Sequence, residues 1–212
     1  IGPNKDTEEK INDYVQCLKI FYEVADYITI NISSPNTSGL RDFHDEDALK
    51  KLLSKINEVR EKSNFNKSFL LKVSPDLDSS QIPVIVKLIL EYKIDGVILT
   101  NTSNKNRDNL KDPNSKENGG LSGKPIRDLS TEFVKKFYRN LNGKIPIIGV
   151  GGVDSGESAF EKIAAGASAV QLYTGLIYKG PNIVKVIKKD LIKILNNKGF
   201  KNISEAVGTS SH

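Results

Sequence analysis

The chain has 212 residues, of which 38% are hydrophobic and 27% charged, which fits one globular domain with a sizeable core and excludes a disordered chain. Its formal net charge of +5 is spread over interspersed Lys, Asp and Glu, without the long basic run that favours nucleic-acid binding. The single cysteine, Cys17, excludes a disulfide framework. No apolar stretch reaches the ~18 residues that a membrane-spanning helix needs.

The first residues resemble the end of a strand and its following loop, Ile1-Gly2-Pro3-Asn4. The sequence also contains no Met and therefore no start residue. We expect this chain to be the carboxyl-terminal part of a longer protein.

Short, nearly continuous runs of Ile, Val, Leu and Thr alternate with segments in which apolar residues recur at i, i+3, i+4 and i+7. The runs are typical of parallel strands covered on both faces, and the spacing is typical of helices with one buried face. In chain order, the expected elements are a helix over 11–22, a strand at 27–33, a helix over 49–56, a strand at 68–74, a helix over 85–92, a strand at 96–102, a long loop over 103–127, a helix over 129–141, a strand at 145–151, a helix over 155–165, a strand at 169–175 and a helix over 181–199.

Several helix ends carry recognisable signals. Gly143 is a plausible stop for the helix over 129–141. Asp154 and Glu157 have the spacing of a capping-box variant at the start of the helix over 155–165. Pro181 and Gly199 suit the two ends of the last helix.

Strict alternation of strands and helices predicts an α/β fold with a parallel sheet, but spacing alone does not separate a doubly wound sheet from a barrel. Polar residues follow several different strands, which is where barrel active sites are built. We therefore predict an amino-terminally truncated (β/α)8 TIM barrel with about strands 4–8 present, forming one domain over 1–212. A complete barrel of this type has eight strands.

The loops after the last two expected strands suggest a phosphate cradle. Gly149, Gly151 and Gly152 precede a helix start, and Tyr173-Thr174-Gly175 follows the final strand. Glycines allow close backbone approach, and helix N-terminal amides favour anions. The alternative is that these glycines only form tight turns.

Lys72 lies inside an apolar strand, where an unpaired ammonium is costly to bury, so it is a candidate to face an anionic ligand. The alternative is a Lys that reaches solvent. The loop over 103–127, with Gly119-Gly120-Leu121-Ser122-Gly123, is long enough to suggest a function, although a flexible surface loop is the other interpretation. Neither His44, in a charged loop, nor His212, at the chain end, is expected to be catalytic.

Turn residues with amide and hydroxyl groups follow two further strands. Asn31 and Ser33-Ser34-Pro35-Asn36-Thr37 belong to the strand at 27–33, and Asn101 and Thr102 to the strand at 96–102. Amides converging at one edge suit a planar ligand with several donors and acceptors. Ordinary turn chemistry accounts for either segment alone.

Six of these segments together resemble the dihydroorotate dehydrogenase family, in matching order and over essentially the whole chain. They are NISSPNTSGLR at 31–41, LKVSPDL at 71–77, TNTS at 100–103, GGLSGKPIRDLS at 119–130, IPIIGVGGVDSG at 145–156 and GASAVQLYTGLIYKGP at 166–181.

The resemblance implies roles for the matching residues. Ser34 would be the general base that removes the C5 proton of dihydroorotate, and Ser rather than Cys there points to class 2. The implied substrate-binding residues are Asn31, Asn36, Asn101 and Thr102. The implied FMN contacts are Asn31, Lys72, Thr100, Ser122, Gly123, Gly151, Gly152, Tyr173 and Thr174. No metal site is expected.

The resemblance also implies a function: FMN-dependent oxidation of dihydroorotate to orotate in pyrimidine synthesis, with electrons passed to a membrane quinone. Such enzymes attach peripherally through an amino-terminal segment, at the cytoplasmic face of a bacterial membrane or at the mitochondrial inner membrane. A Ser hydroxyl is a weak base, so Thr37 is a hypothetical proton relay and 36–46 a hypothetical lid. The alternatives are a class 1 enzyme, a dehydrogenase of another dihydropyrimidine, or an inactive fragment.

Overall fold

The computed structural model describes residues 1–63, 65–105 and 107–211. Within them, one parallel sheet has the strand order β1-β2-β3-β4-β5. Its strands are β1 (Tyr27–Asn31), β2 (Ser68–Val73), β3 (Gly96–Leu99), β4 (Ile147–Val150) and β5 (Ala169–Gln171). Across the sheet, each strand lies next to the strand that precedes it in sequence, so the spatial order follows the chain order without a reversal. That order fits a barrel and excludes a doubly wound sheet, in which the order reverses at a switch point.

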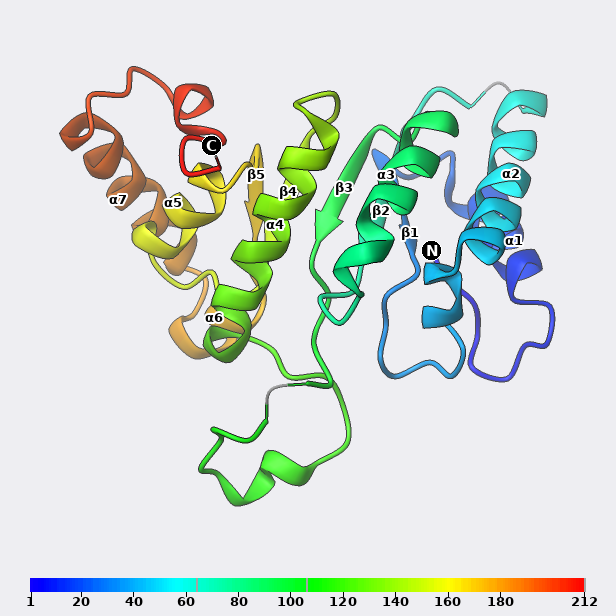
Figure 1. Ribbon diagram of the computed structural model, residues 1–212, viewed down its shortest axis with the longest axis horizontal. Coiled ribbons are helices and arrows are strands. Elements are labelled where there is room, and N and C mark those ends of the chain that lie inside the picture. Colours follow the sequence, from blue (N-terminus) through cyan, green and yellow to red (C-terminus); the bar gives the residue numbers. More distant parts are fainter. Residues whose placement is uncertain (64, 106, 212) are drawn as a thin grey trace.

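The helices line up along the sheet, and the carboxyl ends of the strands face the lower edge of Figure 1. The α-helices are α1 (Lys10–Phe21), α2 (Glu46–Lys62), α3 (Ile82–Glu91), α4 (Arg127–Leu141), α5 (Gly156–Ala164), α6 (Thr174–Lys179) and α7 (Ile183–Asn197). All six expected helices are confirmed. The short helix α6 was not expected, because its first residues were assigned to the strand at 169–175.

The five expected strands are present, but each ends one to four residues earlier than predicted. Burial on both faces is confirmed for β3, whose four residues are all buried, and is wrong for the strands near the sheet edges. In β1, Ile28 and Ile30 are buried while Thr29 and Asn31 are half-buried, and β5 has no buried residue. The reason is that helices pack on one face of the sheet, so the opposite face stays partly open.

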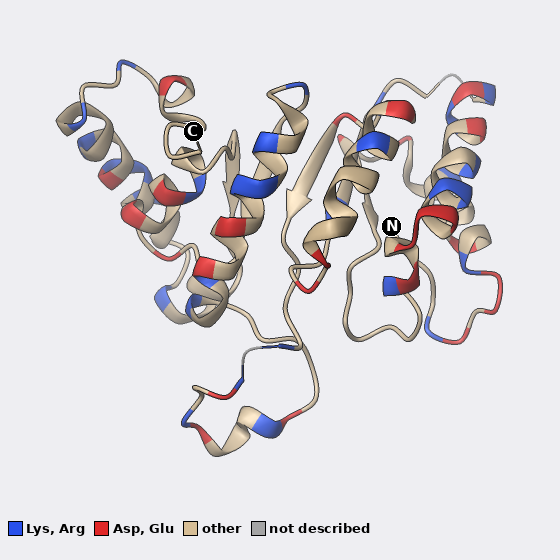
Figure 2. Ribbon diagram, viewed as in Figure 1, with Lys and Arg blue, Asp and Glu red and all other residues tan. Residues whose placement is uncertain are grey.

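The hydrophobic core has two parts. The larger packs α1, α2, α3 and α4 on the strands β1 to β4, around fully buried Tyr14, Phe69 and Phe137. The smaller joins α5 and α7 through Ile163, Ile187 and neighbouring residues. Charged residues concentrate on the helices and the projecting loop, whereas the strands carry few (Figure 2).

One helix-end prediction needs correction, whereas the predicted stop at Gly143, which has φ +70°, is confirmed by the end of α4 at Leu141. The capping box of α5 is formed by Ser155 and Ser158, not by Asp154 and Glu157. Ser155 Oγ accepts from the Ser158 N–H at 3.1 Å, and Ser158 Oγ accepts from the Ser155 N–H at 2.9 Å. A serine hydroxyl at the third helical position reaches back as Glu would. At the end of α4, Asn142 takes the left-handed conformation one residue before Gly143.

Candidate active site

Asn31 and Lys72 lie side by side on the sheet face that the helices leave open. They are register partners on β1 and β2, and Lys72 pairs in turn with Ile98 of β3. Lys72 is half-buried, and this burial lowers the pKa of its ammonium. No Asp or Glu among the described residues lies within ion-pair distance of it. A partly desolvated, unpaired cation at a strand end suits an anionic ligand.

A buried serine ties the two predicted strand-end asparagines together. The Ser33 hydroxyl donates to Asn31 Oδ1 at 2.7 Å and accepts from Asn101 Nδ2 at 3.0 Å, and Ser33 is fully buried. Asn101 Oδ1 also accepts from the Thr102 N–H at 2.8 Å. The structure therefore brings Asn31, Asn101 and Thr102 to one place. Sequence reasoning did not assign Ser33 a role, although its position at a strand end was the available signal.

We call Asn31, Ser33 and Asn101, joined by these hydrogen bonds, the Ser33 knot. Ser34, the next residue, lies half-buried at the same edge. Its hydroxyl accepts from the Asn36 N–H at 3.2 Å, which forms a local turn. Asn36 itself is exposed. Among the described contacts none joins Ser34 to Thr37, so the relay stays a hypothesis.

The second half of the predicted lid, 36–46, is packed into the core. Leu40 and Phe43 are 2% and 7% exposed, and Phe43 packs edge-on against Tyr14 with ring centroids 5.8 Å apart. His44 is buried at 8% exposure rather than lying in an open charged loop. His212 lies outside the described residues.

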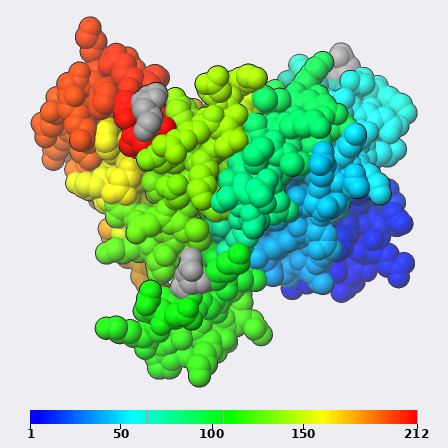
Figure 3. Space-filling view, viewed as in Figure 1, coloured from blue at the N-terminus to red at the C-terminus, as the bar shows by residue number. Residues whose placement is uncertain are grey.

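The long loop over 103–127 folds back onto the strand ends. Ser103 and Leu121 exchange backbone hydrogen bonds of 3.1 and 2.7 Å. A Cβ on Gly120 would clash with Thr102 and stand 2.9 Å from Pro35, so only a glycine fits between those two loops. Figures 1 and 3 show the middle of this loop projecting from the body.

Arg107 holds the projecting part of the loop together through backbone carbonyls. Its guanidinium donates to the carbonyls of Ser115 at 3.0 Å, Glu117 at 2.6 Å, and Gly119. The loop also contains two 3-10 turns, Pro113–Lys116 and Lys124–Ile126. The loop is therefore folded, and its close contact with the strand-end loops lies at Gly120.

The glycines of the predicted phosphate cradle divide into two kinds. Gly151 and Gly152 have φ of +121° and +73°, which only glycine adopts readily, and a Cβ on Gly152 would lie 3.1 Å from the Gly123 carbonyl oxygen. A Cβ on Gly149 would lie 3.0 Å from the Ala167 Cβ, so the role of Gly149 is to leave space for the packing of Ala167. The cradle interpretation therefore rests on Gly123, Gly151 and Gly152.

The last strand brings Thr174 to the same cluster of loops. Thr174 Oγ1 donates to Ser122 Oγ at 2.9 Å, while Tyr173 is 74% exposed. In the first turn of α5, the Ser155 side chain caps only the Ser158 N–H, and Tyr173 at the start of α6 makes no side-chain cap. Amides open to an anion are therefore expected at the starts of both helices.

Thr100 supplies an unsatisfied group beneath these loops. It is 2% exposed, and its Oγ1 has no hydrogen-bond partner among the described residues. A buried polar atom without a partner is uncommon in folded proteins and is expected to meet a ligand or an ordered water.

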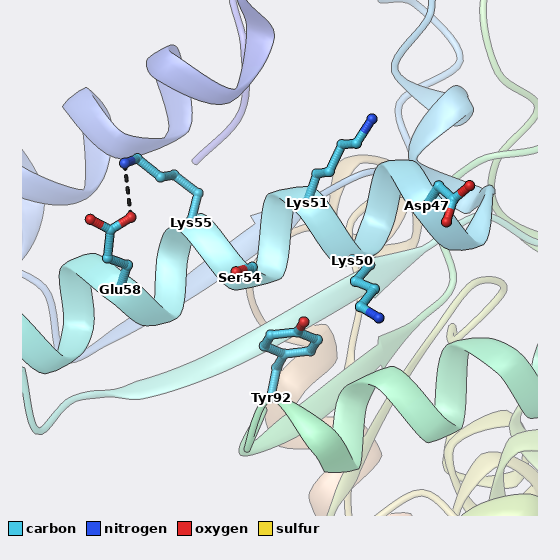
Figure 4. Close-up of a pocket in the computed structure, with 7 residues that line it drawn as sticks. All are labelled: Asp47, Lys50, Lys51, Ser54, Lys55, Glu58 and Tyr92. Carbon is cyan, nitrogen blue, oxygen red and sulfur yellow. Dashed lines mark hydrogen bonds and ion pairs between the residues drawn. The ribbon is translucent and has the colours of Figure 1, made fainter.

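Two surface hollows lie away from this edge and contain none of the predicted site residues. One, of about 390 Å³, lies on α2 between Lys50, Ser54 and Tyr92, and Lys55 there bonds Glu58 at 2.9 Å (Figure 4). The other, of about 600 Å³, lies among α4, α5 and α7 near Phe160 and Lys198. Within the described ranges, no group of three or more His, Cys, Asp and Glu has the arrangement of a metal site, and no helix is long and apolar enough to cross a membrane.

The fold and this edge define a (β/α)-barrel scaffold with its site at the carboxyl ends of the strands. The family model "Dihydroorotate dehydrogenase" matches residues 1–195, so the chain belongs to the dihydroorotate dehydrogenase family. The fold prediction is confirmed by solved structures: DHODH of Eimeria tenella in complex with ferulenol superimposes with a TM-score of 0.95 at 35% identity, over 99% of this chain and 60% of that one.

Curated relatives from animals and bacteria match over the whole length of this chain. The mouse mitochondrial dihydroorotate dehydrogenase (quinone) is 43% identical over 210 residues, covering 98% of this chain and 53% of the relative. The Rhodopseudomonas palustris enzyme of the same name is 43% identical over 215 residues, covering 100% and 59%. The chain thus spans little more than half the length of these relatives.

Proposed function

We propose that this chain forms the part of a quinone-linked dihydroorotate dehydrogenase that holds FMN and dihydroorotate and removes the substrate's C5 proton. The observation that carries the proposal is the convergence, at one edge of the sheet, of Lys72, the Asn31–Ser33–Asn101 knot and Ser34. The names of the relatives support the same reaction.

The protein groups have separate tasks in this reaction. Oxidising a C5–C6 single bond requires a proton acceptor for C5 and a hydride acceptor for C6, and a bound flavin supplies the hydride acceptor. Ser34 is the proposed proton acceptor, and Asn31, Asn36, Asn101 and Thr102 are proposed to orient the planar ring. A weakly basic hydroxyl needs a neighbouring group or water to carry the proton away.

The residues at this edge fit FMN. Lys72 offers an unpaired, partly desolvated cation for negative charge on the isoalloxazine, and Thr100 offers a buried hydroxyl without a partner. Glycines with positive φ leave the backbone open to a phosphate. The proposed FMN-binding residues are Asn31, Lys72, Thr100, Ser122, Gly123, Gly151, Gly152, Tyr173 and Thr174.

The proposed electron acceptor is a membrane quinone; the relatives are named dihydroorotate dehydrogenase (quinone). They include both bacterial and mitochondrial enzymes. We propose peripheral membrane association through a segment amino-terminal to the part described here, and a single FMN-binding domain over 1–212.

The test begins with flavin binding. In the protein that carries this chain, purified with its flavin, anaerobic dihydroorotate is expected to bleach the flavin absorbance band. Ser34→Ala is expected to keep the flavin but to slow this bleaching by orders of magnitude, about 10²-fold or more for a lost general base. A colourless protein that FMN does not reconstitute would refute the cofactor assignment, and near-normal bleaching by the Ser34 variant would remove Ser34 from its role.

A further inference from the structure

An ion pair that the proposed mechanism does not use joins three loops at the active edge. Asp76, in the loop after β2, has a side chain only 7% exposed. Arg41 Nη1 meets its Oδ2 at 2.9 Å, the Asn104 N–H donates to the same oxygen at 2.8 Å, and the Ser103 hydroxyl donates to Oδ1. We call Arg41, Asp76 and Ser103 the rim latch.

The guanidinium of Arg41 also reaches a proposed substrate-binding residue. Its Nη2 donates to the carbonyl oxygen of Thr102 at 3.3 Å, while Nη1 holds Asp76. The planar fork of arginine can satisfy two acceptors in fixed geometry, which a lysine ammonium does not reproduce. Arg41 therefore fixes the backbone at Thr102 relative to the loop after β2.

The position of Arg41 in its own loop matters equally. Leu40 and Phe43 beside it are buried in the core, whereas Asn36 and Ser38 are exposed. The segment that contains Ser34 thus leaves strand β1, passes through exposed residues and is held in place again at Arg41. Anchoring that point limits the positions that Ser34 and Asn36 can take.

We propose that Arg41 and Asp76 are positioning residues, which hold the Ser34 loop and Thr102 in the geometry that receives the substrate. This rests on the proposed function, in which Ser34 and Thr102 meet dihydroorotate. The latch joins the loops that follow β1, β2 and β3, so one carboxylate sets the relative place of all three. Removing its charge leaves Arg41 without its partner and frees the three loops together.

The same chain contains a control pair at the opposite end of the strands. Asp95 bonds Arg60 Nη2 at 3.3 Å and accepts from the Phe69 N–H at 2.8 Å. Like Asp76, it is an aspartate that joins an arginine and a backbone amide. Its place next to the amino ends of the strands keeps it away from the active edge.

The first measurement is amide hydrogen exchange, which needs no activity. In Asp76→Asn, amides over 100–105 and 36–44 are expected to exchange at least about tenfold faster, while Asp95→Asn leaves these segments at the wild-type rate. Arg41→Lys is expected to keep protection at Asn104 and to give 36–44 an exchange rate between those of the wild type and Asp76→Asn, because an ammonium keeps the bond to Asp76 but loses the one to Thr102. Unchanged exchange in Asp76→Asn, or equal changes in both aspartate variants, would overturn the proposal.

The second measurement is steady-state kinetics of the flavin-loaded protein. Asp76→Asn is expected to raise KM for dihydroorotate about tenfold and to lower kcat as well, with flavin content unchanged, because the latch positions both the binding residue Thr102 and the base Ser34. Unchanged KM and kcat, or a loss of flavin, would overturn the positioning role. If the wild-type protein does not oxidise dihydroorotate, the proposed function fails, and the exchange result still decides whether the latch orders these loops.

Discussion

Removing the Ser33 hydroxyl is expected to loosen the active edge without touching the proposed base. Ser33 is fully buried, and its hydroxyl makes two side-chain bonds, of 2.7 Å to Asn31 and 3.0 Å from Asn101. Each such bond contributes roughly 1 kcal/mol, so Ser33→Ala is expected to lower the free energy of unfolding by about 2 kcal/mol. For a chain of this size, that corresponds to a fall in melting temperature of about 4–8 °C.

The neighbouring serine provides the control. The Ser34 hydroxyl accepts one exposed hydrogen bond, from the Asn36 N–H at 3.2 Å. The free energy of unfolding of Ser34→Ala is therefore expected to lie within about 0.5 kcal/mol of the wild-type value. Thermal unfolding of both variants measures the difference, and titration with orotate is expected to show about tenfold weaker binding for Ser33→Ala, since two amides lose their fixed orientation. A Ser33→Ala protein that melts with the wild type would show that this hydroxyl does not hold the two amides together.

Gly152→Ala is expected to destabilise the fold by about 2 kcal/mol or more, because its φ is +73° and a Cβ would lie 2.7 Å from the Arg127 Cα. Gly143→Ala is the control, because its φ is +70° but the space around it is open, so it shows only the backbone strain of about 1 kcal/mol. Denaturant unfolding of both variants separates the clash from the strain. Equal losses in both variants would contradict the close approach. Burial, with the nearby Arg41 guanidinium, lowers the pKa of His44 from 6.5 to about 4. Between these values the unfolded chain binds a proton that the folded chain does not, so the unfolding free energy falls by about 1.4 kcal/mol per unit as pH drops from 6.5 to 4. His44→Leu removes this dependence, and a wild-type advantage over the variant that stays constant across that pH range would refute it.

The sequence predicted the order of elements well, because the apolar patterns of strands and helices are local. It placed strand ends too late because β-favouring residues such as Thr100 and Thr102 continue the pattern, while strand β3 has already ended at Leu99. The same error concealed α6, whose first residue, Thr174, reads as part of a strand. Local propensity does not register where a neighbouring strand stops.

The site was predictable where function depends on residue type at a strand end, as for Lys72, Asn31 and Asn101. It was not predictable where function depends on contacts between distant segments. Ser33 appears in the sequence as one of two adjacent serines, and only the structure distinguishes the buried connector from the half-buried candidate base. Asp76 and Arg41 are 35 positions apart, and no periodicity links them.

The proposed flavin contact Lys72 and the proposed substrate contacts Ser34 and Thr102 are held in different ways. Lys72 lies on strand β2, where the backbone ladders to β1 and β3 fix it. Ser34 and Thr102 lie on loops, which need cross-links to reach comparable precision, and these loops carry the Ser33 knot and the rim latch. If the site is used as proposed, changes to the knot or the latch must affect substrate more than flavin, because Lys72 keeps its support on strand β2 when either is broken.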